Sequence, residues 1–191
     1  MLAFDIETTG LDFAKDHITV ACVYDPVAGV RKSFVFPKGD SPAEFMDMLD
    51  RADVLCAFNG AVFDLTFIQR QWNVPVGRVF RWRIKLYDVF ENCRQLFSST
   101  FSLNSLLLLN NIKVKTGSGK EAVQMAHAGR WRELCDYCMQ DTIKTWSVSN
   151  LSTIQIPVPL GRGLQLMLDQ ENWAAHRFYV VSQETAQTAV M

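Results

Sequence analysis

Residues 4–10 read Phe-Asp-Ile-Glu-Thr-Thr-Gly, and this stretch says more about the fold and the chemistry than any other part of the chain. Apolar residues alternate with acids, which is typical of a strand with one buried face. Residues two apart on a strand point to the same side, so Asp5 and Glu7 project together while Phe4 and Ile6 enter the core. Neighbouring carboxylates repel each other unless cations lie between them, which makes the pair a candidate metal site. The alternative is a solvated pair on an exposed strand.

The opening stretch begins a predicted antiparallel meander with strands over residues 2–6, 17–24 and 31–36. Further strands are expected over 54–58 and 83–87. Ser41, Pro42 and Glu44 form a capping sequence that starts a helix reaching about residue 51. Other helices are expected over 61–72, 103–109, 121–127 and 131–148. This order favours an α/β fold, in which a mixed sheet of about five strands is flanked by helices.

Two further groups of polar residues could join the first acidic pair. Asn59 follows a predicted buried strand and can cap the next helix, which places Asp64 in a first turn where the helix dipole favours an anion. Tyr137 and Asp141 are four residues apart on a predicted helix, so their side chains share one face. Each group alone also fits a structural explanation, as helix N-terminal chemistry or as a core tyrosine beside a surface acid.

Together, and in this order, the three pieces resemble the motifs of the DEDD exonuclease superfamily. Residues 4–10 look like its first motif, and residues 59–64 (Asn-Gly-Ala-Val-Phe-Asp) look like the second, Asn-x-x-x-Phe/Tyr-Asp. Residues 137–141 (Tyr-Cys-Met-Gln-Asp) look like the third, Tyr-x-x-x-Asp, whose tyrosine marks the DEDDy branch. The other branch has His five residues before the last Asp, where this chain has Asp136. The resemblance covers about residues 1–150 and implies a ribonuclease-H-like fold.

The resemblance implies a metal-dependent 3′–5′ exonuclease that hydrolyses phosphodiester bonds at single-stranded DNA or RNA 3′ ends by a two-metal mechanism. By the same resemblance, Asp5 bridges two cations. Glu7 and Asp141 complete the site of the ion that generates the nucleophile, and Asp64 holds the second ion. A ligand set made only of oxygen favours Mg²⁺ or Mn²⁺ over Zn²⁺. Tyr137 would orient the attacking water, because its ordinary pKa of about 10 makes it a poor general base at pH 7.

Substrate contacts are predicted beside these acids. By resemblance, the segment after the first motif meets the terminal nucleotide through its backbone and through apolar contact with the base, and the second motif contributes two more residues. The predicted contacts are Thr8, Thr9, Gly10, Leu11, Asn59 and Phe63. Such stacking tolerates any base. An ordinary turn explains Thr9 and Gly10 equally well.

A basic face is predicted on the strand over 83–87. Arg81, Arg83 and Lys85 alternate with apolar residues, so on a strand they would point to one side. Three cations in a row could hold phosphates of an incoming nucleic acid. A solvated strand edge that discourages aggregation explains the pattern about as well.

Length and composition limit the class of protein. A chain of 191 residues suits one domain, and its net charge of −1 argues against a strongly basic nucleic-acid binder unless bound cations supply the positive charge.

The five cysteines are odd in number, which favours reduced thiols in the cytoplasm, with the nucleus as an open alternative. The lone Cys135-x-x-Cys138 pair lacks partners for zinc. The Gly117–Lys120 loop departs from a Walker A motif. Membrane spans are not expected, since no run of about 18 apolar residues occurs.

Residues 151–191 are interpreted as a C-terminal extension, separate from an exonuclease domain over residues 1–150. The extension is apolar enough that it must pack on its own domain, on a second copy of the chain or on another protein. A short helix is expected from Leu164 to Trp173. Three alternatives to a stand-alone exonuclease stay open at this point: a structure-specific nuclease on the same fold, a non-catalytic binding module, and a subunit of a larger nucleic-acid-processing assembly.

Overall fold

A mixed sheet of five strands lies between two layers of helices in the computed structural model, which describes residues 1–97, 101–114, 117–157 and 163–167. The predicted meander forms β1 (Leu2–Thr8), β2 (Ile18–Asp25) and β3 (Val30–Val35). Two short parallel strands, β4 (Leu55–Ala57) and β5 (Leu86–Asp88), extend the sheet on the other side of β1, so the strand order is β3-β2-β1-β4-β5. The predicted α/β fold is therefore confirmed.

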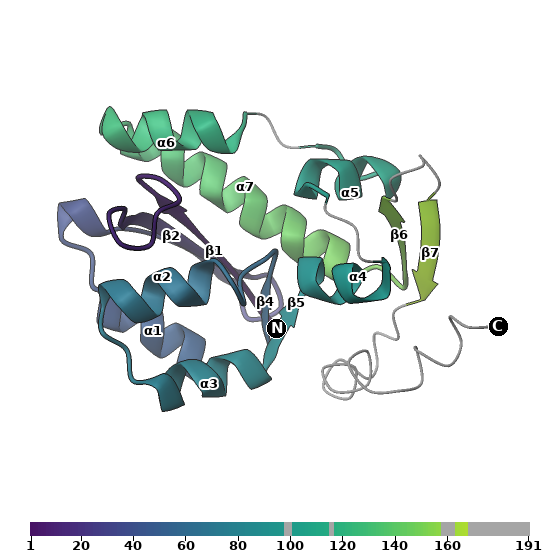
Figure 1. Cartoon of the computed structure of the whole chain (residues 1–191), viewed down its shortest axis with the longest axis horizontal. Coiled ribbons are helices and arrows are strands. Elements are labelled where there is room, and N and C mark those ends of the chain that lie inside the picture. Colours follow the sequence, from purple (N-terminus) through teal and green to yellow (C-terminus); the bar gives the residue numbers. More distant parts are fainter. Residues whose placement is uncertain (98–100, 115–116, 158–162, 168–191) are drawn as a thin grey trace.

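The helices divide between the two faces of the sheet (Figure 1). One face carries α1 (Pro42–Arg51), α2 (Asp64–Gln71) and α3 (Val76–Ile84). The other carries α7 (Trp131–Ser149), with α6 (Gly119–His127) packed beside it. The remaining helices are α4 (Val89–Phe97) and α5 (Leu103–Leu109). Within the described ranges, no helix is both long and apolar enough to cross a membrane.

Side chains alternate along the central strands, so neighbouring residues enter hydrophobic clusters on opposite faces of the sheet. Phe4 and Ile6 of β1 belong to the buried cluster that packs against α1 and α2. On β2, Val20 and Cys22 belong to a different cluster, which they share with residues of α6 and α7. Asp5 lies opposite Cys22 and Glu7 lies opposite Val20, so the two acids face the α7 layer. The period of two in residues 4–7 thus directs the carboxylates to the helix that carries the third motif.

Side-chain caps start two of the helices. Ser41 caps α1 by accepting a hydrogen bond from the Glu44 backbone N–H at 3.3 Å, as predicted. Ser118 caps α6, where it exchanges hydrogen bonds with Glu121 in a complete capping box. The second cap fixes the end of α6 that borders the site.

The predicted strand over 83–87 is wrong for its first part, because helix α3 continues to Ile84 and the strand begins only at Leu86. Alternating charges there mimic a strand, but tertiary contacts favour the helix. The Trp82 indole donates to Asp50 of α1 at 2.6 Å, and Arg78 forms an ion pair with the same carboxylate at 2.6 Å. Arg81 and Arg83 consequently lie on a helix rather than on one basic face of a strand.

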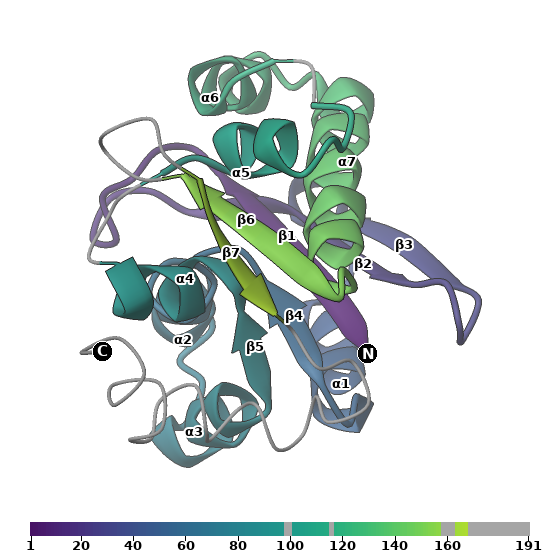
Figure 2. The same ribbon diagram turned by 90° about the vertical axis from the view of Figure 1, so that its right-hand side faces the viewer.

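The C-terminal segment adds a separate two-stranded sheet, formed by β6 (Thr153–Pro157) and β7 (Gly163–Met167) (Figure 2). Ile154 and Ile156 are fully buried in a cluster with residues of α5 and α7. The start of the extension therefore packs on its own domain. The predicted helix from 164 to 173 is wrong for the part within β7, and residues 168–173 lie outside the described residues.

Candidate active site

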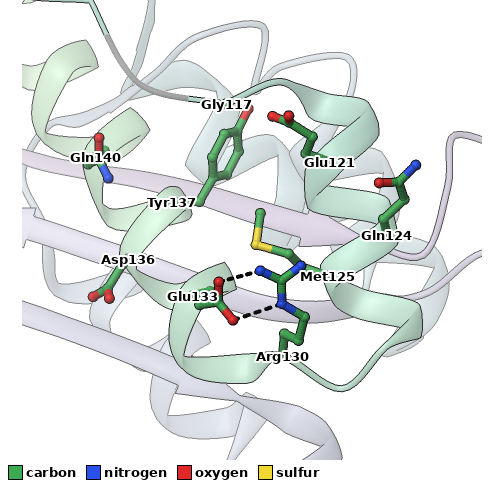
Figure 3. A pocket seen from close by; sticks show the side chains of 9 residues that line it. All are labelled: Gly117, Glu121, Gln124, Met125, Arg130, Glu133, Asp136, Tyr137 and Gln140. Carbon is green, nitrogen blue, oxygen red and sulfur yellow. Dashed lines mark hydrogen bonds and ion pairs between the residues drawn. The ribbon is translucent and has the colours of Figure 1, made fainter.

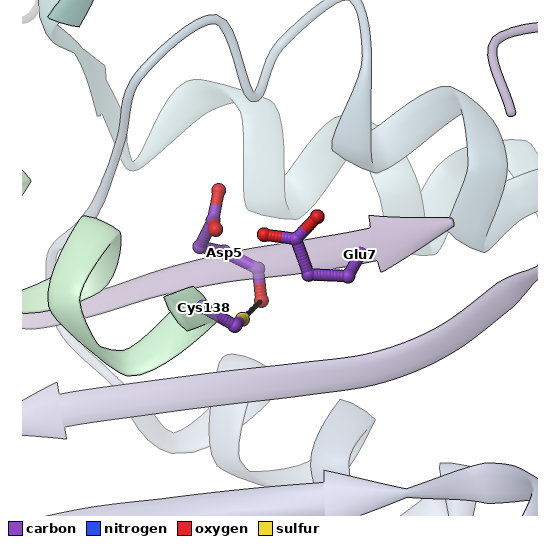
Figure 4. A group of neighbouring side chains, drawn as sticks. All are labelled: Asp5, Glu7 and Cys138. Carbon is purple, nitrogen blue, oxygen red and sulfur yellow. Dashed lines mark hydrogen bonds between the residues drawn. The ribbon is translucent and has the colours of Figure 1, made fainter. Parts of the chain in front are cut away.

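The carboxylates of Asp5 and Glu7 project from the same side of β1, as the sequence predicted (Figure 4). Cys138 of α7 lies beside them, and one potential ligand atom from each of the three residues falls within 4.8 Å of the others. The thiol donates a hydrogen bond to the Asp5 backbone carbonyl at 3.5 Å. This bond ties α7 to the strand that carries the acidic pair.

Cys138 is a poor metal ligand despite its position. Burial raises the pKa of its thiol well above the ordinary value, with further contributions from Cys22 and the neighbouring acids, so the sulfur keeps its proton. The donors left at this place are carboxylate oxygens, which suit Mg²⁺ or Mn²⁺. The proximity of Cys138 was missed from the sequence, where Cys135 and Cys138 were considered only as a possible zinc pair.

Asp64 reaches β1 from the edge of the sheet. Strand β4 pairs with β1 only at Leu2 and Ala3, so within the described part of the chain the edge of β1 beyond them has no neighbouring strand. The Asp64 carboxylate accepts a hydrogen bond from the Ile6 N–H there at 3.1 Å. The third carboxylate is thereby held beside the strand that carries Asp5 and Glu7.

The ionised form of Asp64 is unfavourable in the protein by itself. Its side chain is 2% exposed, and burial raises its pKa to about 8, with a second contribution from the negative charge of Asp88. A cation bound nearby would offset this cost, because it favours the charged form of the carboxylate. The donor set and its electrostatics therefore fit a divalent metal ion.

Asn59 does not cap the next helix, contrary to the prediction. Helix α2 begins at Asp64, its N-cap residue is Phe63, and no side chain caps it. Asn59 instead adopts a left-handed conformation (φ 64°), which a non-glycine residue takes at some cost. Its backbone N–H donates to the carboxylate of Asp88 at 2.9 Å. An additional turn therefore separates β4 from α2.

Tyr137 and Asp141 share one face of α7, and both are largely buried, at 5% and 8% exposure. The tyrosine ring points toward Gly117 (Figure 3). A Cβ added at Gly117 would lie 3.3 Å from two ring carbons, and this residue has a φ of +90°, which glycine tolerates best. Glycine at this position therefore allows the loop before α6 to pass close over the tyrosine.

One cavity of about 850 Å³ collects most of the predicted site. It is bordered by all five predicted catalytic residues, namely Asp5, Glu7, Asp64, Tyr137 and Asp141. Four predicted substrate residues also line it: Thr8, Leu11, Asn59 and Phe63. Residues that were not among the predicted catalytic and substrate residues complete the wall, namely Ile6, Phe58, Ser118, Gly119, Lys120, Val123 and Gln124. Tyr137 also borders a second cavity of about 450 Å³ between α6 and α7 (Figure 3).

Thr9 and Gly10 are not among the lining residues of that cavity. The Thr9 hydroxyl donates to Asp16 at 3.0 Å, and a ring nitrogen of His127 lies 3.0 Å from the Thr9 carbonyl oxygen. A Cβ on Gly10 would collide with the Asp16 carboxylate at 2.3 Å. These contacts support the turn interpretation, in which the two residues shape the loop that carries Leu11.

Arg81 and Arg83 also lie away from the lining of the cavity. Both are exposed on α3, and Arg83 donates to the Ala61 backbone carbonyl at 3.4 Å. Lys85, the third cation of the predicted basic face, donates to the carbonyls of Asp50 and Ala52, each at 2.7 Å. Among the described residues, Lys120 of α6 is a cation that does border the cavity.

Comparisons with known proteins agree with this architecture. The family model of the RNase_H superfamily matches residues 2–153. No curated protein matches the chain. Among solved structures, a family B DNA polymerase from the hyperthermophilic archaeon Pyrobaculum calidifontis is similar, with a TM-score of 0.61 and 18% sequence identity over 78% of this chain. The matched part is 24% of the polymerase chain, and at this identity the likeness shows the fold alone.

Proposed function

Because the chain belongs to the RNase_H superfamily, we propose that it is a metal-dependent 3′–5′ exonuclease of the DEDDy type. One observation carries this proposal: four carboxylates and a tyrosine, delivered by β1, α2 and α7, line a single cavity. The same cavity also has apolar lining residues, among them Leu11, Phe58 and Phe63, and its volume of about 850 Å³ is within the usual range of ligand sites. The motifs supply the residue types and the fold supplies their proximity, so the proposed site depends on both.

The four carboxylates would hold two divalent cations. Asp5, Glu7 and Asp141 would bind one, while Asp5 and Asp64 would bind the other. When bound, such ions lower the pKa of a water and offset the charge that develops on the leaving oxygen. The raised pKa of Asp64 supports this assignment, because a carboxylate so costly to ionise gains most from an adjacent cation.

Tyr137 would position the attacking water. Its ring is fixed between α7 and the loop at Gly117, so its position is set by packing on both sides. A tyrosine hydroxyl donates and accepts hydrogen bonds, which allows it to orient a water without removing the proton itself. Proton transfer then depends on the lowered pKa of the water.

The substrate would enter as a single strand with its terminal base against the apolar wall. Leu11 is 75% exposed at the rim, and Phe58 and Phe63 provide aromatic surface inside the cavity. Aromatic stacking accepts any base, so little sequence preference is expected. Lys120 supplies a positive charge for a backbone phosphate on the wall formed by α6. DNA and RNA are both candidate substrates.

The proposal is tested with oligonucleotides labelled at the 5′ end, as single-stranded DNA and RNA, incubated with Mg²⁺, Mn²⁺ or excess EDTA. A ladder that shortens one nucleotide at a time from the 3′ end is expected with metal, and intact substrate with EDTA. Asp5→Asn, which changes one carboxylate to an amide of the same shape, is the matched inactive control. Equal cleavage by wild type and this variant would refute the assignment. Cutting of a circular single strand would instead favour the structure-specific nuclease.

A further inference from the structure

A fifth carboxylate, Asp88, lies beside the proposed metal-binding acids without belonging to them. It ends β5, is 4% exposed, and accepts four backbone hydrogen bonds. Two come from the loop after β4, from Asn59 at 2.9 Å and Ala61 at 2.7 Å. Two come from the first turn of α4, from Phe90 and Glu91, each at 3.1 Å. One side chain therefore fastens two segments that are separate in sequence.

The loop held by Asp88 is also the segment that starts α2. While the N–H groups of Asn59 and Ala61 donate to Asp88, the carbonyl of Gly60 between them accepts a hydrogen bond from the Leu65 N–H of α2 at 2.9 Å. Asp64 is the first residue of that helix. Nothing but this turn connects β4 to Asp64, so a shift of the loop would move the carboxylate relative to β1.

An acid at position 88 carries an electrostatic cost. Burial is the main factor that raises its pKa, and its charge also raises the pKa of Asp64. A neutral side chain would avoid this repulsion, but an amide could accept hydrogen bonds through only one of its two end atoms. Since Asn59 and Ala61 donate to different oxygens of Asp88, only a carboxylate satisfies both with its two ends.

We propose that Asp88 is a positioning residue, which clamps the turn over residues 59–61 and so sets the place of the Asp64 carboxylate beside β1. The inference rests on the proposed function, because it takes Asp64 to be a metal ligand. Asp88 would act through Asp64 and would not itself bind the ion. Partners of metal ligands commonly have this effect, and their loss lowers metal affinity by about 10- to 100-fold.

The test is Mn²⁺ binding to the full chain, measured by isothermal titration calorimetry together with thermal unfolding. Asp88→Asn keeps the size of the side chain and its acceptors at one end, but turns an amide donor toward the Ala61 N–H. We expect the Mn²⁺ site that contains Asp64, the weaker of the two because it has fewer carboxylate ligands, to lose about 10-fold in affinity or more. In an Asp64→Asn background, the same change should have no further effect on Mn²⁺ affinity, because the residue through which it acts is already gone.

Two further variants keep the inference open to refutation. Glu91→Gln removes a negative charge next to Asp88 but keeps all four hydrogen bonds, so its Mn²⁺ affinity should stay within about twofold of wild type. Ala61→Pro removes a donor to Asp88 without altering any carboxylate, and it should reproduce the loss if Asp88→Asn does not fold.

The outcomes separate the two proposals. Wild type that binds no Mn²⁺ would overturn the proposed function itself. Wild type that binds Mn²⁺, with an Asp88→Asn variant that melts earlier but binds equally well, would make Asp88 merely structural. An equal loss of affinity in Glu91→Gln would assign the effect to charge and overturn the clamp.

Discussion

Replacing Asp64 with Asn should stabilise the metal-free protein at pH 8 while destroying its weaker metal site. In the folded state burial, assisted by the charge of Asp88, raises the pKa of Asp64 from 3.8 to about 8. Between these values the folded protein keeps the proton and the unfolded chain releases it, so rising pH favours unfolding. The contribution of this group to stability is therefore present below pH 4 and lost as the pH approaches 8.

The size of the effect follows from the width of that interval. A shift of about four pKa units corresponds to roughly 5 kcal/mol at pH 8, which is the upper limit for one group. Asn is uncharged and keeps an oxygen that can accept from the Ile6 N–H, so it should recover much of this free energy. For a chain of this size each 1 kcal/mol raises the melting temperature by about 2–4 °C, so an increase on the order of 10 °C is expected.

Thermal unfolding followed by circular dichroism measures this difference. Wild type and Asp64→Asn are compared in EDTA at pH 4 and pH 8, and the two melts should coincide at pH 4. Asp88 is present in both proteins, and because its charge contributes to the raised pKa of Asp64, its repulsion of Asp64 is part of the measured difference. Excess Mn²⁺ should narrow the difference at pH 8, because ligand at about 100 times its Kd adds about 2.7 kcal/mol only where its site is intact. Equal or lower stability of the variant in EDTA at pH 8 would refute the reasoning.

Asp141→Ala should abolish cleavage in the gel assay and leave the circular dichroism spectrum unchanged; retained cleavage would make this acid structural. Tyr137→Phe should keep Mn²⁺ binding but lose roughly 10- to 100-fold in turnover, a smaller loss than for Asp141→Ala. Unchanged turnover would show that the Tyr137 hydroxyl does not position the attacking water. Ile156→Ala should lower the free energy of unfolding in urea by about 2–5 kcal/mol, since the side chain is fully buried. A loss below about 1 kcal/mol would indicate that β6 does not belong to the core. Exchanging both Arg81 and Arg83 for Glu should leave the salt dependence of nucleic-acid binding unchanged, because neither lines the cavity; a flatter dependence would restore the phosphate-binding role.

Local periodicity was sufficient to predict the parts of the site that lie on regular elements. The period of two placed Asp5 and Glu7 on one side of β1, and the spacing of four placed Tyr137 and Asp141 on one face of α7. Asp64 was also found, although only through the order of the motifs. Its position depends on an unpaired sheet edge, which no pattern within the second motif reveals.

The remaining features depend on contacts between distant segments. The role of Asp88 is not visible in the sequence, because its partners at Asn59 and Ala61 are 29 and 27 residues away. The prediction of a strand over 83–87 failed in its first part because the hydrogen bond from Trp82 to Asp50 of α1 stabilises a helix there. The alternating charges of this segment are typical of a strand and do not indicate that helix. Lys120 borders the cavity only because α6 packs on α7, which periodicity does not show.

The bond between Cys138 and the carbonyl of Asp5 spans 133 positions, and it has a consequence for how the protein is made. Strand β1 emerges from the ribosome long before α7, and such distant contacts form late because a large loop must close first. A nascent chain therefore carries an exposed acidic pair without its fourth carboxylate until α7 has been synthesised and has docked. The proposed cation site is therefore completed only once this distant contact has formed.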